Sequence, residues 1–391
     1  DKDEIVYPRT FIEELSKRNL LGIRFPKKWG GREMTWVAEM AATEEIGCLG
    51  TALSCAFIMS SIVGEALNMF GTDVLKEKYL KPTLEGELIP AEALTEPRGG
   101  SDFFGVTTKA VLEGDHFIVN GQKRFVVGAE GVDYFLVYCK TNFEPDAHKL
   151  QRISLLVVDK GPGVRTEHLY GLMGSRGAGT GRVVFRNVKV PKKNLVGELH
   201  GGAICFNQMM IPERLASAGG ALGIWGSLDV ALRYSNKRRA FGKSIRKFQA
   251  VNFMIADSIT QLDAARGLTY MAARAVDENY PSVRRIVSEA KKFSTDTAWD
   301  VVNNAMQIMG GIGYTEIFPI ERALRDTRLA MIWTGTNQIM DVLIQHEYYD
   351  EVLNQPYDRR KMEKDAMNPD ENERCYTDED MWNVHDNQVS D

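Results

Sequence analysis

Residues 93–108, ALTEPRGGSDFFGVTT, have the composition of a loop that holds a planar ligand. The adjacent glycines at 99 and 100 let a backbone approach a ring closely, and Thr95 and Ser101 offer hydroxyl groups to it. The same residues are also typical of a structural turn. The segment alone leaves both interpretations open.

A basic and aromatic segment, residues 237–251, carries groups that suit a phosphorylated cofactor. Arg238 provides a guanidinium, Phe241 an aromatic face and Gln249 an amide. A helix end whose basic residues favour the helix dipole would show the same pattern. This segment also needs support from elsewhere in the chain.

The segment IWTGTNQI, residues 332–339, places Gly335 and Thr336 between two apolar runs. Threonine is a good residue for the start of a helix, and a helix N-terminus presents free N–H groups to an anion. A plain connection between two helices is the alternative. Upstream, Gly310 and Gly311 interrupt another helical pattern.

Composition and charge argue against several classes of protein. A net charge of −5 and the lack of basic runs with interleaved aromatics argue against a nucleic-acid surface. We expect no apolar stretch to reach the roughly 18 residues that span a bilayer, and the first residues, DKDEIVYPRT, do not resemble a signal peptide. The five cysteines are scattered, so neither a disulfide framework nor a metal site is predicted. A reducing compartment follows: the cytoplasm, or the mitochondrial matrix if the chain is eukaryotic.

Hydrophobic periodicity divides the chain into four parts and predicts an α+β fold. Residues 1–88 have helical spacing, residues 89–197 the pattern of an antiparallel β domain, and residues 198–350 that of a helical bundle. The β domain is expected to be a barrel, with a sandwich as the alternative. Asn120-Gly121 is expected to form a hairpin turn in it. The acidic residues 351–391 are expected to form a loosely ordered tail or a partner-contacting arm.

In this order and at these separations, the segments resemble the acyl-CoA dehydrogenase family. ALTEPRGGSD is similar to the family's flavin loop, RRAFGKSIRKFQ to its adenosine-diphosphate contact, and QIMGGIGYTE with ERALRDTR to its C-terminal signature. GSRGAGTGRVVFRNVKVP resembles the end of its β domain. The likeness implies an N-terminal helical domain, a middle antiparallel β-barrel and a C-terminal helical bundle. The family usually has more helical sequence before these residues, so some N-terminal sequence is expected to be missing.

The resemblance implies a flavoenzyme that desaturates an acyl-CoA thioester between its α and β carbons. FAD would lie between the β domain and the bundle, partly across a subunit interface of a homotetramer, and an electron-transferring flavoprotein would take the electrons. The positions that match the family's FAD contacts are Leu94, Thr95, Gly100, Ser101, Phe125, Val126, Val127, Arg238, Phe241, Gln249, Gln307, Gly310, Gly311, Thr336 and Gln338. Those implied to contact substrate are Ser101, Arg214 and Gly335.

The catalytic base is where this sequence departs from many relatives. They have a glutamate before the Gly-Thr pair, whereas this chain has Thr334. Relatives similar to isovaleryl- and long-chain acyl-CoA dehydrogenases place the glutamate on an earlier helix, at the position of Glu213. A thioester α-proton is weakly acidic, so its removal needs a carboxylate made more basic by desolvation. The resemblance implies that Glu213 takes this proton while the backbone N–H of Thr334 holds the thioester oxygen.

Alternatives to this assignment remain open. Pro212-Glu213 also resembles the first turn of a helix, where a glutamate merely favours the dipole. Glu92, beside the flavin loop, is the second candidate for the base; it could instead contact a polar substrate group or face water. Val127 lacks a hydroxyl that many relatives place near the flavin, and Arg98 adds a charge to the loop.

The acyl group is expected to be branched, cyclic, aromatic or long, because moving the base changes the wall around the reacting carbons. Two rival functions stay open. One is a flavin oxidase or monooxygenase on the same scaffold. The other is a catalytically silent flavin-binding partner subunit, which the missing carboxyl at 334 and the acidic tail would suit.

Overall fold

The computed structural model describes residues 7–354. Of these, residues 7–347 belong to one compact unit, and residues 348–354 belong to a second unit. Nearly all of the predicted tail at 351–391 lies outside the described residues.

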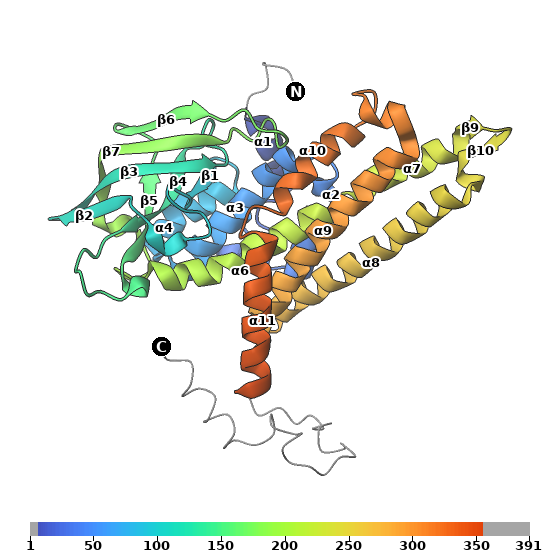
Figure 1. Ribbon diagram of the computed structural model, residues 1–391. Coiled ribbons are helices and arrows are strands. Elements are labelled where there is room, and N and C mark those ends of the chain that lie inside the picture. The colour runs from blue at the N-terminus through green and yellow to red at the C-terminus, as the bar shows by residue number, and fades with distance from the viewer. Residues whose placement is uncertain (1–6, 355–391) are drawn as a thin grey trace, which may run out of the picture. The chain divides into compact units, whose positions relative to one another are not determined.

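Helices precede the first strand of the described chain. They are α1 (Arg9–Lys17), α2 (Trp36–Gly47), α3 (Thr51–Phe70), α4 (Asp73–Leu75) and α5 (Lys81–Leu84). The sequence of α3 is apolar or small on every side, and all its residues from Ser54 to Leu67 are buried. A helix that is hydrophobic all round belongs in a core, and α3 packs against both β1 and α6 (Figure 1).

The β domain forms one sheet with an open path of strands. Its strands are β1 (Pro90–Ala93), β2 (Lys109–Glu113), β3 (His116–Val126), β4 (Tyr134–Lys140), β5 (Ile153–Asp159), β6 (Val164–Leu169), β7 (Gly181–Pro191) and β8 (Leu195–Val196). Their order is β6-β7-β3-β2-β4-β5-β8, and β1 pairs with β4 in parallel. The prediction of a closed barrel is wrong, because the end strands β6 and β8 do not pair with each other. The alternation of residues along a strand shows which side chains share a face, but it does not show which strands pair. The pattern therefore could not predict whether the sheet closes.

The predicted hairpin turn at Asn120-Gly121 is also wrong. β3 runs through both residues, and the ladder to β7 shifts register there as in a β-bulge. Glycine is required at 121 because its φ is +150° and a Cβ would lie 2.6 Å from the Cα of Thr108. The turn lies earlier, where Gly114 and its neighbour connect β2 to β3.

The rest of the unit is a helical bundle with one small hairpin. Its helices are α6 (Gly202–Leu222), α7 (Trp225–Lys237), α8 (Gln249–Asp277), α9 (Val283–Met309), α10 (Ile320–Ala330) and α11 (Asn337–Leu353), and the hairpin is β9 (Arg239–Ala240) with β10 (Lys243–Ser244). Small residues let α6 dock closely on the end of α2, since a Cβ on Gly47 would lie 2.5 Å from the carbonyl oxygen of Gly220. Pro212 lies inside α6, so the alternative that placed Glu213 in the first turn of a helix is wrong.

Two helical stretches in the described chain are long and apolar enough to cross a membrane, contrary to the expectation from the sequence. They are Thr51–Phe70 and Gly202–Lys237. Of their most apolar windows, 78% and 61% of the residues are buried inside the fold. Core helices pass the same test of length and composition.

One carboxylate joins the three parts of the fold. Asp326 on α10 is 7% exposed. One of its oxygens accepts a hydrogen bond from the Ser175 N–H of the β domain at 2.6 Å, and the other from the Thr51 N–H at the start of α3 at 3.3 Å. The bundle, the β domain and the N-terminal helices therefore meet at this side chain.

We predict that Asp326→Ala lowers the free energy of unfolding by about 2–4 kcal/mol, because it leaves two buried N–H groups without acceptors. Urea titration of the purified protein measures this. Asp229→Ala is the matched control: Asp229 is an exposed helical aspartate paired with Arg233, and its loss should cost less than about 1 kcal/mol. Equal losses in the two variants would contradict the role given to Asp326.

Candidate active site

Thr336 caps the N-terminus of helix α11, as the sequence predicted. Its hydroxyl accepts a hydrogen bond from the Ile339 N–H at 3.2 Å, and its carbonyl oxygen accepts one from the Met340 N–H at 3.0 Å. The helix starts at the next residue, Asn337. The residues before it, 331–336, form a loop that we call the Thr334 loop.

The Thr334 loop holds two consecutive residues in the left-handed backbone region. Thr334 has a φ of 53° and Gly335 a φ of 86°. A β-branched residue rarely adopts this conformation, and such residues gather at functional sites. The Thr334 hydroxyl is buried and has no hydrogen-bond partner among the described residues. The loop thus carries both backbone strain and an unsatisfied polar group.

A buried lysine holds the Thr334 loop in place. The Lys291 ammonium on α9 donates to the Gly335 carbonyl oxygen at 2.9 Å and to Asn337 Oδ1 at 2.7 Å. Burial, followed by the nearby Arg214 charge, lowers the pKa of Lys291 to about 7. Sequence reasoning missed this residue, although a lysine at a core-facing position of an amphipathic helix was a usable signal.

The Thr334 loop lies along the face of α6 that carries Glu213. The Trp333 indole N–H donates to the Ser217 hydroxyl at 2.8 Å. Ser217 follows Glu213 by one helical turn, and residues at this spacing share a face. Glu213 is half-buried there. Arg214, on the next face, is buried and donates to the Ser288 hydroxyl on α9 at 3.2 Å.

Glu92 reaches the same place from the sheet. It lies on β1, which pairs with β4 so that Glu92 is opposite Leu136, and Tyr138 follows on the same face. The Oε1 atom of Glu92 and the Tyr138 hydroxyl are buried without hydrogen-bond partners in the described chain. Burial, then the charge of the neighbouring Glu213, raise the pKa of Glu92 well above its usual range.

Aromatic rings close this region against water. Phe103 stacks on Phe206 of α6 with ring centroids 3.8 Å apart. Tyr138 meets Phe103 edge-on at 5.2 Å and Phe206 at 6.3 Å. The unpartnered polar atoms of Glu92 and Tyr138 therefore lie beside an apolar wall, where charge–charge interactions are strong.

The loop that follows β1, residues 94–107, is anchored to β3. We call it the glycine loop. The Lys123 ammonium, which is fully buried, lies 2.9 Å from the Leu94 carbonyl oxygen and 2.9 Å from Glu96 Oε1. The Arg124 N–H donates to the Thr95 carbonyl oxygen at 2.9 Å. These bonds fix the start of the loop, whereas Gly100 and Ser101 at its centre are exposed.

The residues after Lys123 present an aromatic ring and a cation. Phe125 has a φ of 56° and is 48% exposed, and the Arg124 guanidinium lies 4.8 Å from its ring centroid. The Arg124 Nε atom is buried and has no partner in the described chain. Val126 is buried and Val127 half-buried beside them. An exposed ring next to an unpartnered donor suits a planar, polar ligand.

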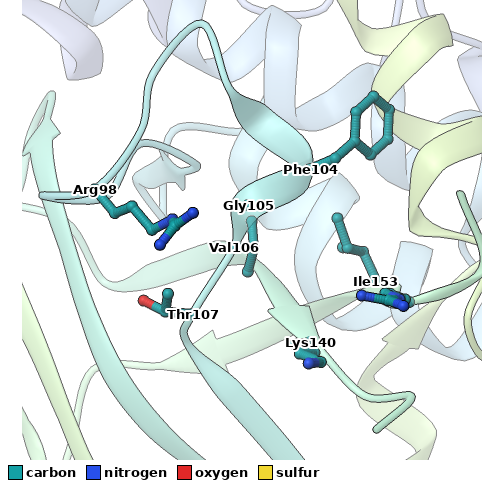
Figure 2. Close-up of a pocket in the computed structure, with 8 residues that line it drawn as sticks. Arg98, Phe104, Gly105, Val106, Thr107, Lys140 and Ile153 are labelled. Atoms are coloured by element: carbon teal, nitrogen blue, oxygen red, sulfur yellow. The ribbon is translucent and has the colours of Figure 1, made fainter. Parts of the chain in front are cut away.

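A cationic cavity of about 220 Å³ lies on the other side of the glycine loop. Arg98, Lys140 and Arg152 line it together with Thr107, and Figure 2 shows Arg98, Thr107 and Lys140 around the opening. No acidic residue lines it. Three cations are a donor set for phosphate oxygens, whereas the Thr107 hydroxyl already donates to Glu96 at 2.5 Å. The sequence had marked only Arg98 of these residues.

The remaining predicted cofactor residues lie elsewhere. Arg238, Phe241 and Gln249 surround the β9–β10 hairpin, which Figure 1 shows at the end of the bundle away from the sheet. Phe241 is 93% exposed with a φ of 50°. The last predicted set, Gln307, Gly310 and Gly311, is exposed at the end of α9. One chain therefore does not bring the β9–β10 residues to the glycine loop.

Three family models match the chain, one after another. They are described as "Acyl-CoA dehydrogenase, N-terminal domain" over residues 1–87, "Acyl-CoA dehydrogenase, middle domain" over residues 91–188, and "Acyl-CoA dehydrogenase, C-terminal domain" over residues 200–348. Together they span most of the chain.

Relatives and solved structures give the same result. The chain is 37% identical to a 3-(aryl)acrylate reductase of Clostridium sporogenes, over 86% of this chain and 89% of the relative. It is 36% identical to the caffeyl-CoA reductase-Etf complex subunit CarC of Acetobacterium woodii, with the same coverage. The structure of butyryl-CoA dehydrogenase from Megasphaera elsdenii is similar with a TM-score of 0.85 and 31% identity, over 88% of this chain and 90% of that one.

We predict that Lys291→Met destabilises the protein by about 2–4 kcal/mol, because the Gly335 carbonyl and the Asn337 amide oxygen lose a buried donor. Urea unfolding measures the loss. Lys292→Met is the matched control, since the neighbouring Lys292 is one-third exposed and forms only ion pairs of 3.5 Å, worth about 1 kcal/mol or less. A Lys291 variant as stable as the Lys292 variant would show that the loop does not depend on this contact.

Proposed function

The chain belongs to the acyl-CoA dehydrogenase family of enzymes that act on CH–CH groups, and from this premise we propose that it desaturates an acyl-CoA thioester between its α and β carbons. The observation that carries the proposal is the placement of Glu213. Its carboxyl group is half-buried on α6, next to a strained loop that has a threonine where many relatives have the base. A carboxyl beside a dry, aromatic wall is suited to accept a weakly acidic proton.

Glu213 takes the α-proton in this proposal. As the Cα–H bond breaks, the new O–H bond forms on a Glu213 oxygen, and negative charge develops on the thioester oxygen. The Thr334 N–H is placed to hold that oxygen, because no described residue accepts a hydrogen bond from it. The side chain at 334 is then dispensable, and the backbone conformation of the loop is what the reaction needs.

FAD is the cofactor that the family implies, and the residues present fit it. The unpartnered Arg124 Nε, the exposed ring of Phe125 and the anchored Thr95 offer polar and aromatic contacts to its ring system. Near the end of α9, a Cβ added to Gly310 or Gly311 would meet no atom within 4 Å, so there is open space beside both residues. When bound, FAD would accept the β-hydride of the substrate.

A second copy of the chain completes this cofactor site in our proposal. The β9–β10 residues Arg238 and Phe241 are exposed at the far end of the bundle, out of reach of the glycine loop of the same chain. An aromatic side chain that is 93% exposed is suited to burial against a partner. The family's homotetramer would supply that partner.

The cationic cavity of Arg98, Lys140 and Arg152 is suited to the phosphates of coenzyme A. It lies beside the glycine loop, whose Ser101 is exposed for contact with the substrate. The thioester could then extend from the phosphates toward Glu213.

The acyl group is proposed to be branched, cyclic, aromatic or long. A cavity of about 170 Å³ lies between α3, α6 and α10, and Ser217 and Trp333 belong to its wall. A cavity of about 150 Å³ holds a benzene ring, so this one has room for a ring. The relative named 3-(aryl)acrylate reductase supports the same class of substrate.

The proposed electron partner is an electron-transferring flavoprotein, since one relative is named as a subunit of a complex with Etf. Because two relatives are named reductases, reduction of an enoyl-CoA at the same site is the second candidate function. We further propose a cytoplasmic location, or the mitochondrial matrix in a eukaryote, without a membrane span: the two long apolar helices are mostly buried in the fold.

We predict that anaerobic addition of a cyclic or aromatic acyl-CoA bleaches the flavin of the FAD-loaded protein. Glu213→Gln should slow this reduction by roughly 10²–10⁴, because the amide cannot accept the proton. Thr334→Ala should change it little. Stopped-flow absorbance gives the rates, and reoxidation of the reduced protein by an enoyl-CoA tests the reductase direction.

Glu278→Gln is the matched control, since Glu278 is exposed at the end of α8 and pairs with Arg274. The proposal fails if no acyl-CoA bleaches the flavin. Glu213 loses its role if its variant is as fast as the control.

A further inference from the structure

Glu92 is a half-buried residue with a buried Oε1 atom, and the proposed reaction leaves it without a role. It lies between Ala91 and Ala93, which are both fully buried on β1. Its Oε1 atom receives no hydrogen bond from any described residue. An ionised carboxylate in such a place costs several kcal/mol of desolvation unless a cation or donors compensate it.

Three titratable groups act on Glu92: Glu213 on α6, Tyr138 on β4 and Lys123 on β3. Lys123 is already committed to Glu96 at 2.9 Å and to a backbone carbonyl. The Tyr138 hydroxyl is unpartnered, but it is neutral. Glu92 therefore has no cation of its own, and its remaining neighbour is a second carboxyl.

Two neighbouring carboxyl groups in an apolar site cannot both ionise, so one of them keeps a proton. Both glutamates are half-buried, but the Oε1 atom of Glu92 is buried without a donor among the described residues, and burial followed by the Glu213 charge raises the pKa of Glu92. Glu213 is half-buried and lies beside the Arg214 cation, with which it interacts. The proton therefore belongs on Glu92 and the charge on Glu213.

We propose that Glu92 and Glu213 form a pair that shares one proton, carried by Glu92, and that this proton positions the Glu213 carboxylate for its task as base. The inference rests on the proposed function and adds a residue to it. Glu92 is a positioning residue: its O–H donates to one oxygen of Glu213 and leaves the other oxygen free for the substrate.

The proton balance is simple. Before the reaction the pair holds one proton and one negative charge. The substrate Cα–H bond breaks and an O–H bond forms on the free oxygen of Glu213, while the electron pair stays with the thioester. The Glu92 proton does not leave. The pair then holds two protons and no charge, so no second negative charge builds up beside the developing enolate.

Two variants separate this role from simple packing. Glu92→Gln keeps the size and the donor but cannot ionise, so flavin reduction by the best acyl-CoA should stay within about threefold of the wild type. Glu92→Met fills the space without a donor, and reduction should slow about tenfold or more, the effect of losing one charge-assisted hydrogen bond. Equal rates for the two variants would overturn the positioning role.

A second measurement needs no turnover. In the folded protein Glu92 keeps its proton above the ordinary pKa of 4.5, whereas the unfolded chain releases it. The unfolded state therefore binds fewer protons, and the stability contributed by this group falls as pH rises above about 4.5. Oxidised FAD-loaded Glu92→Gln should match the wild type below pH 4.5 and become progressively more stable than it at higher pH. A difference that does not change with pH would overturn the shared proton.

The Glu213→Gln background separates this inference from the proposed function. Without the Glu213 charge, the pH-dependent difference in unfolding free energy between proteins with Glu92 and with Gln at this position should shrink. If Glu213→Gln reduces flavin at the wild-type rate, the base assignment fails while the pH-dependent gap still reports the pair. If Glu213→Gln slows flavin reduction but the stability of Glu92→Gln relative to the wild type does not change with pH, the base assignment stands and the shared proton is ruled out.

Discussion

The position of the site depends on the Asp326 carboxylate, which connects three parts of the fold. Its two hydrogen bonds, to the Ser175 N–H and the Thr51 N–H, tie α10 to the β domain and to the start of α3. The Thr334 loop begins directly after α10, so these two hydrogen bonds also fix where that loop starts. Trp333 then connects the loop to α6 through Ser217. A site assembled from three separate parts of a chain needs such fixed points, because small misplacements of reacting groups are costly.

Two glutamates four residues apart show how the fold assigns charge. Burial alone would raise the pKa of Glu96, but the Lys123 ammonium and the Thr107 and Thr108 donors lower it to about 2. Glu92 has no such partners, and its pKa is raised. The same strand and loop therefore hold one carboxylate firmly ionised and one carboxyl protonated. The first anchors the glycine loop, and the second is free to act on Glu213.

Local chemistry made part of this structure predictable. Thr336 was identified as a helix start because threonine capping is written in a few adjacent residues, and the three-part order of helices, sheet and bundle followed from a change of period. The family resemblance implied a base at Glu213, and that assignment stays a prediction. The wrong predictions concern contacts between residues that are not adjacent in the chain. Closure of the sheet depends on which strands pair, and the bulge at Gly121 depends on the close approach of Thr108.

The contacts that sequence reasoning missed join residues that are far apart in the chain. Lys291 donates to the carbonyl of Gly335, and Glu92, which the sequence marked only as a candidate base, interacts with Glu213 on α6. Neither contact has a local signature, since each residue alone reads as an ordinary charged side chain. A lysine in the core-facing stripe of α9 and a glutamate between two buried alanines were the available signs. Both signs indicate burial, and neither names a partner.

Proton transfer to Glu213 is the central claim, and α-proton exchange tests it most directly. An acyl-CoA with sulfur in place of the β carbon has no β-hydride to lose, so it isolates the first step. In heavy water, mass spectrometry of this thioester measures deuterium uptake at the α carbon by the FAD-loaded protein. We predict rapid deuterium uptake with the wild type and with Glu92→Gln, and deuterium uptake slowed about a hundredfold or more with Glu213→Gln. Wild-type exchange by the Glu213 variant would contradict it.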